Sequence, residues 1–204
     1  MRFRGATPAA AVFALSFLLA AHAHAGDVRG SIRLAKDPKD PGEISPAIVW
    51  IEGVTEGVKV PSEKPAMSQK GAKFEPAFMV IVAGQTVAMP NDDNIVHNVF
   101  SKSSAKEFDL GFYPKGTSKE VVFPKPGVVD VFCSIHRSMR ARILVVPNQH
   151  HAEAPIGESF EIAEVPDGDY VLRCWHEDYP LQKRKISVRE GSPVKSDFTL
   201  IAKK

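Results

Sequence analysis

Neither charge predominates in this sequence, and long apolar stretches are scarce. Its 204 residues include 26 basic and 24 acidic side chains, so it lacks the strong basic excess that is typical of nucleic-acid-binding proteins. Beyond residue 25 no segment approaches the roughly 20 apolar residues that a membrane-spanning helix needs. The composition therefore predicts neither a nucleic-acid partner nor a membrane span.

Common catalytic motifs are also lacking. The sequence contains no G-x-S-x-G motif, no glycine-rich phosphate loop and no H-E-x-x-H motif. A c-type haem needs a second cysteine directly before its histidine, and no cysteine stands there. We therefore do not expect an enzyme of these classes or a haem protein.

Residues 1–25 resemble a signal peptide. Arg2 and Arg4 supply a positive start, Ala9–Ala20 is apolar, and Ala23-His24-Ala25 matches an A-x-A cleavage site. Export to the periplasm is the expectation.

Only two cysteines are present, and an oxidising compartment would favour a disulfide between them. Cys133 stands in the polar segment Cys-Ser-Ile-His-Arg-Ser-Met, however, whereas Cys174 stands within the strand-like run Tyr170–Trp175. These different surroundings argue against a disulfide, and we expect Cys174 to be a buried, inert thiol.

The sequence predicts an all-β protein, because β-branched and aromatic runs alternate with Gly, Pro, Asn and Asp and no helical apolar period is sustained. The clearest expected strands are Val28–Leu34, Ala47–Ile51, Phe78–Val82, Thr86–Met89, Val128–Cys133, Arg142–Val146, Tyr170–Trp175, Lys185–Val188 and Asp197–Ile201.

Two proline-rich breaks divide the chain after the signal peptide into a first flank (26–62), a central block (66–148) and a second flank (154–204). The first flank has only two clear strands, too few to bury a core alone. We therefore expect the flanks to form one small β-sandwich into which the central block is inserted.

The flanks resemble the transthyretin-like or carboxypeptidase-regulatory sandwich. The resemblance rests on the opening segments Gly30–Leu34 and Ala47–Gly53 and on the closing segment Phe160–Leu172.

The central block contains four residues that suit a metal. His97 is followed downstream by Cys133-Ser-Ile-His136-Arg-Ser-Met139, a C-x2-H-x2-M loop. Two imidazoles, a thiolate and a thioether are the ligand set of blue copper sites. Zinc is the alternative, but it prefers Cys, His and carboxylates to a thioether. Met139 could instead fill a gap in the core.

Two polar neighbours support the metal interpretation. Asn98 follows the first histidine and Ser134 follows the cysteine, so we expect them to link the two ligand segments and to donate toward the sulfur. Such contacts orient ligands and tune a metal's redox potential.

With these ligands the central block resembles the cupredoxins, and its short ligand loop is similar to that of amicyanin. The resemblance extends over Phe74–Pro76, Val80–Val87, His97–Val99 and Gly127–Cys133. The whole chain is similar to bacterial cupredoxins joined to a regulatory-type sandwich, of the kind called methylamine utilisation proteins.

This resemblance implies a Greek-key β-sandwich with one type 1 copper ion bound by His97, Cys133, His136 and Met139. It also implies single-electron transfer between periplasmic partners, such as a c-type cytochrome or a dehydrogenase, with His136 as the exit for the electron.

The loop departs from the cupredoxin pattern at Ile135, where proline is common, and at Arg137-Ser138. These changes predict a weaker apolar docking face. Arg137, Arg140 and Arg142 predict instead a basic rim that steers an acidic partner.

Two other functions stay open: a copper carrier or storage protein, and a docking sandwich with an attached copper domain. His150-His151 and His176 could form a second metal site, although solvated linker and surface residues are the preferred interpretation.

Overall fold

The computed structural model describes residues 25–36 and 45–202. Within these ranges the chain forms strands β1–β17 and no helix, so the predicted all-β class is confirmed. No helix in the described part of the chain could therefore cross a membrane. The predicted signal peptide lies outside the described residues, except for Ala25.

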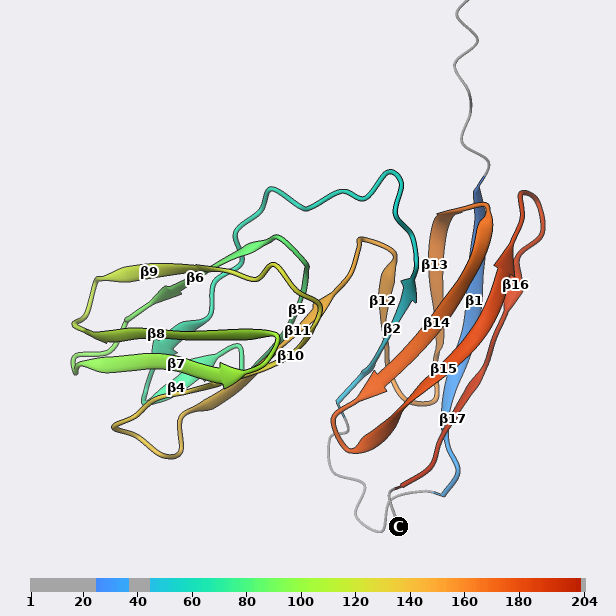
Figure 1. Cartoon of the computed structure of the whole chain (residues 1–204). Coiled ribbons are helices and arrows are strands. Elements are labelled where there is room, and N and C mark those ends of the chain that lie inside the picture. The colour runs from blue at the N-terminus through green and yellow to red at the C-terminus, as the bar shows by residue number, and fades with distance from the viewer. Residues whose placement is uncertain (1–24, 37–44, 203–204) are drawn as a thin grey trace, which may run out of the picture.

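The central block forms the left half of Figure 1. A five-stranded sheet has the order β5-β11-β10-β7-β8, and β6-β9 and β3-β4 are separate pairs. The strands are β3 (Ser68–Lys70), β4 (Lys73–Glu75), β5 (Phe78–Val82), β6 (Thr86–Pro90), β7 (His97–Ser103), β8 (Lys106–Tyr113), β9 (Ser118–Val122), β10 (Gly127–Phe132) and β11 (Arg140–Val146).

The two flanks form the right half of Figure 1. One sheet has the order β13-β1-β16, with β17 also paired to β1, and the other has the order β12-β2-β14-β15. The strands are β1 (Ala25–Leu34), β2 (Ala47–Glu52), β12 (His151–Ala154), β13 (Ser159–Pro166), β14 (Gly168–His176), β15 (Tyr179–Val188), β16 (Val194–Lys195) and β17 (Phe198–Leu200).

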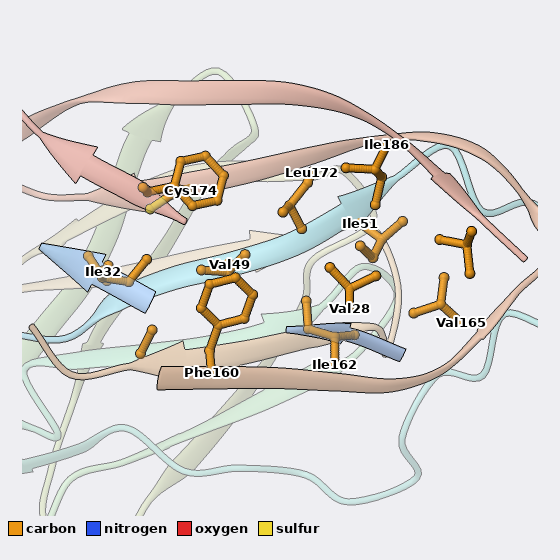
Figure 2. Close-up of a cluster of buried hydrophobic side chains, with 14 of the residues drawn as sticks. Val28, Ile32, Val49, Ile51, Phe160, Ile162, Val165, Leu172, Cys174 and Ile186 are labelled. Carbon is orange, nitrogen blue, oxygen red and sulfur yellow. The ribbon is translucent and has the colours of Figure 1, made fainter. Parts of the chain in front are cut away.

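Strands from both flanks share one hydrophobic core. β1 pairs with β13, and β2 lies between β12 and β14. The period-two alternation of β1 buries Val28 and Ile32, which pack with Phe160 and Leu172 of the second flank. Figure 2 shows these side chains converging between the two sheets. Neither flank alone supplies this core.

A separate apolar layer joins the flanks to the central block. On β11, Ile143 and Val145 face the core of the central block, whereas Leu144 and Val146 face the flank sheet. They meet Trp50 of β2 in a cluster that also contains Trp175, whose ring stacks on Phe78 with centroids 5.5 Å apart. Both faces of this part of the sheet are therefore buried.

Every expected strand overlaps a strand of the structure, but several boundaries differ. β11 begins two residues before Arg142, and β10 ends one residue before Cys133. Eight further strands were not among the clearest expectations: β3, β4, β7, β8, β9, β12, β13 and β16. In β7, β8 and β9, lysines, serines and glutamates interrupt the apolar pattern. Pairing with neighbouring strands, rather than local propensity, defines them.

Candidate metal centre

The predicted ligands come from two places in the central block. His97 is the first residue of β7, while Cys133, His136 and Met139 lie in the turn between β10 and β11. Register pairing of Phe132 with Arg140 closes this turn into a short loop. A donor from a distant strand therefore meets three residues of one loop.

Three of the predicted ligand side chains converge. The Cys133 Sγ atom lies 3.9 Å from Nδ1 of His97 and 3.9 Å from Nδ1 of His136, and the two Nδ1 atoms are 3.2 Å apart. His97 is fully buried, Cys133 is almost so, and His136 is half-buried. Among the described residues this is the one cluster of His, Cys, Asp or Glu with metal-binding geometry.

Met139 is held close to this cluster by the backbone. Its N–H donates to the His136 carbonyl at 2.9 Å, and its own carbonyl accepts from the Cys133 N–H at 3.3 Å. Its side chain is buried in the same apolar cluster as Cys133. Burial agrees with both a fourth ligand and a core side chain, so the thioether as a ligand stays a prediction.

A carboxylate that the sequence analysis did not single out determines the state of the His97 ring. His97 Nε2 donates to Asp93 Oδ2 at 2.7 Å, so in the neutral ring the lone pair lies on Nδ1, the nitrogen 3.9 Å from the Cys133 sulfur. Hydrogen bonds, first among them that from the Ala72 N–H, hold the pKa of Asp93 below its ordinary value. The four-residue spacing from His97 was visible in the sequence, but nothing there indicated that a loop would fold the carboxylate onto the ring.

The surroundings of the Cys133 thiol favour its ionised form. Burial alone would raise its pKa, but the backbone N–H groups of His136, Asn98 and Ile135 outweigh burial and lower the pKa from 9.0 to about 6. A thiolate beside two imidazole nitrogens is a donor set that fits copper, since the sulfur suits Cu(I) and the nitrogens suit both oxidation states.

The expected link between the ligand segments is present. The Ser134 N–H donates to Asn98 Oδ1 at 3.4 Å, and Asn98 Nδ2 donates to Asp109 Oδ1 at 2.7 Å. Asp109 was not anticipated, because it lies on β8 and reaches Asn98 only through strand pairing. The segments carrying His97 and Cys133 are therefore tied together by a buried amide.

The surface around the ligands is more apolar than expected. Four large apolar side chains flanking the ligand segments are 45–60% exposed: Ile95, Val96, Phe112 and Ile135. The expected basic rim is also smaller, because Arg142 pairs with Asp130 at 2.7 Å and approaches Glu177 at 3.7 Å. Arg137 and Arg140 are exposed.

The other histidines do not gather into a second cluster in the described part of the chain. His176 Nε2 donates to the Ser45 carbonyl at 2.9 Å, and His151 Nδ1 lies 3.3 Å from the Asn148 carbonyl. Neither cysteine forms a disulfide, and Cys174 is buried in the flank core, where burial raises its pKa to about 12.

The two thiols should titrate far apart in the metal-free protein. We expect the ultraviolet thiolate absorption to appear with a midpoint near pH 6, as Cys133 ionises. Because the folded pKa lies below the unfolded one, the thiolate adds stability at high pH, and this contribution is lost as pH falls through about 6. Cys133→Ser should remove the transition and Cys174→Ser should keep it. A midpoint near 9 would contradict the prediction.

Comparison with protein-family models and with curated proteins gives no match for this chain. Solved structures with similarity include a Cu-containing nitrite reductase from Thermus scotoductus SA-01, with 25% identity and a TM-score of 0.40 over 46% of this chain. The match covers only 25% of that reductase. A purple cupredoxin from Nitrosopumilus maritimus has 26% identity and a TM-score of 0.37, over 41% of this chain and 100% of its own. A mutant of amicyanin in its reduced form has 20% identity and a TM-score of 0.39, over 48% of this chain and 98% of its own.

Proposed function

We propose that this chain is a type 1 copper protein that carries single electrons between periplasmic redox partners. One observation carries the proposal: the Nδ1 atoms of His97 and His136 and the Cys133 sulfur meet within 4.8 Å of one another. Copper bound by these atoms and by Met139 would supply a one-electron Cu(II)/Cu(I) couple.

The protein's own part is to keep the donor atoms in place. Asp93 fixes the tautomer of His97, and the Asn98 amide ties the His97 segment to the Cys133 loop. Backbone N–H groups stabilise the Cys133 thiolate. Ligands held in this way need little rearrangement when the charge of the site changes by one, which suits electron transfer.

A redox role is favoured over catalysis because four protein ligands leave no open position for a substrate. The half-buried His136 is the proposed electron exit, and the exposed Ile95, Val96, Phe112 and Ile135 would form an apolar docking face near it. Arg137 and Arg140 would add positive charge for a partner with an acidic surface. Electron exchange with such a partner, for example a c-type cytochrome, should slow as salt is added. A salt-independent rate would exclude this steering.

The test is copper loading of the protein expressed without residues 1–25. We expect one copper ion per chain, an intense visible thiolate-to-copper absorption, and reversible voltammetry with the metal retained. A colourless copper complex would overturn the proposal. Loss of copper on each reduction cycle would support a copper carrier or storage protein instead.

A further inference from the structure

The tip of the β3–β4 hairpin lies against the loop that leads to His97. Gly71 and Ala72 form this tip, and both have positive φ values, 60° and 52°, as in two-residue type I′ turns. The Gly71 N–H donates to Asp93 Oδ1 at 2.6 Å and the Ala72 N–H donates to Asp93 Oδ2 at 2.9 Å. Both carboxylate oxygens of Asp93 are therefore held by the hairpin.

Asp93 is fixed from its own loop as well. Its N–H donates to Oδ1 of the fully buried Asn91 at 2.9 Å, and Asn91 Nδ2 donates to the carbonyls of Ile95 and Tyr113, each at 2.9 Å. The adjacent Asp92 N–H donates to the Gln69 carbonyl at 2.9 Å, which ties this loop to β3. The position of the carboxylate is thus determined from two directions.

His97 makes the third hydrogen bond to this carboxylate, at 2.7 Å. The His97 side chain is fully buried and the Asp93 side chain is 14% exposed, so little water screens the pair. A carboxylate on the far nitrogen of a ligating imidazole makes the near nitrogen a stronger donor. Its negative charge also favours the more highly charged state of a metal at that nitrogen.

We infer that Asp93 is a positioning residue for His97, and that the tip of the β3–β4 hairpin, by holding both oxygens of Asp93, favours Cu(II) over Cu(I) at the site. This inference rests on the proposed function. The β3–β4 hairpin supplies no ligand, but by this inference it affects the copper affinity and the redox potential of the centre.

Asp93→Asn tests the charge, and Asp92→Asn is its matched control. Asp92 is the neighbouring, exposed carboxylate and accepts from the Ser68 hydroxyl rather than from His97. We expect Asp93→Asn to weaken Cu(II) binding about 10- to 100-fold, with a smaller change for Cu(I). A tenfold difference between the two states raises the potential by about 59 mV. Asp93→Glu keeps the negative charge and should bring the copper affinity and the potential part of the way back to the wild-type values. Asp92→Asn should resemble the wild type.

A metal-free measurement tests the positioning separately. Nitrogen NMR of the wild type, recorded across a pH titration, should show the neutral His97 ring as the Nε2–H tautomer, and Asp93→Ala should lose this preference. Thermal unfolding of each metal-free variant identifies any variant that has simply failed to fold, and the inference is then judged on Asp93→Glu against Asp92→Asn.

The outcomes separate the inference from the proposed function. If the wild type is blue and Asp93→Asn has the same copper affinity and potential as Asp92→Asn, the inference is wrong and the proposed function stands. If the wild type binds no copper, the proposed function fails, and the assignment to copper fails with it. In that case the tautomer of His97 still decides whether Asp93 positions the ring.

Discussion

Replacing Cys133 with serine should abolish the visible absorption of the copper-loaded protein completely. The absorption requires charge transfer from a thiolate, and a serine hydroxyl stays protonated where the Cys133 thiol, with a pKa of about 6, is ionised. Loss of the anionic sulfur should also weaken copper binding in both oxidation states, since it removes the one charged donor of the candidate site. Optical titration with each oxidation state measures both effects.

Cys174→Ser is the control for this experiment. Cys174 is the other cysteine, lies in the flank core, and has a pKa of about 12. The Cys174→Ser variant should keep the full visible absorption, although the loss of a buried thiol costs some stability. An absorption that survives Cys133→Ser, or disappears with Cys174→Ser, would place the metal elsewhere.

Val146→Asp should unfold the protein or nearly so. Val146 has no exposed surface and packs in the apolar layer between the central block and the flank sheet. An aspartate there loses about 1.5–3 kcal/mol of apolar burial and places a carboxylate among apolar side chains. We expect a loss of at least about 4 kcal/mol in the free energy of unfolding, measured by chemical denaturation of the metal-free protein.

Val122→Asp makes the same chemical change on a strand of the central block where the valine is 49% exposed. It should alter the free energy of unfolding by no more than about 0.5 kcal/mol. Comparing the two variants also tests whether the flanks are merely attached to the central block. If they were, Val146→Asp would resemble Val122→Asp, because Val146 would then lie on a dispensable surface.

The apolar layer that contains Val146 could be predicted only in part. Successive residues of β11 face opposite sides of the sheet, and both sides are buried. In the sequence this appears as a continuous apolar run, Ile143–Val146, which indicates a strand buried on both faces. What covers the second face could not be inferred, because Trp50 and Trp175 come from strands that are distant from this run in the sequence, one before it and one after it. Such contacts follow from sheet stacking and leave no local pattern.

The candidate site divides in the same way. Residue type and spacing alone indicated His97, Cys133, His136 and Met139, since a C-x2-H-x2-M loop brings its members together through local turn geometry. The hydrogen-bond partners around the site emerged only from the folded chain: Asp93 for His97, and Asp109 for the neighbouring Asn98. Carboxylates are common in loops, and none of them is marked by sequence as a hydrogen-bond partner.

The sequence by itself therefore determined the all-β class, the clearest strand runs and the chemical identity of the candidate ligands, because these depend on residue type and on local pattern. Only the tertiary structure decided which carboxylate holds His97, that a hairpin tip holds this carboxylate, and that Arg142 pairs with Asp130. These features depend on strand register and on the packing of sheets, which bring together groups that are distant in sequence.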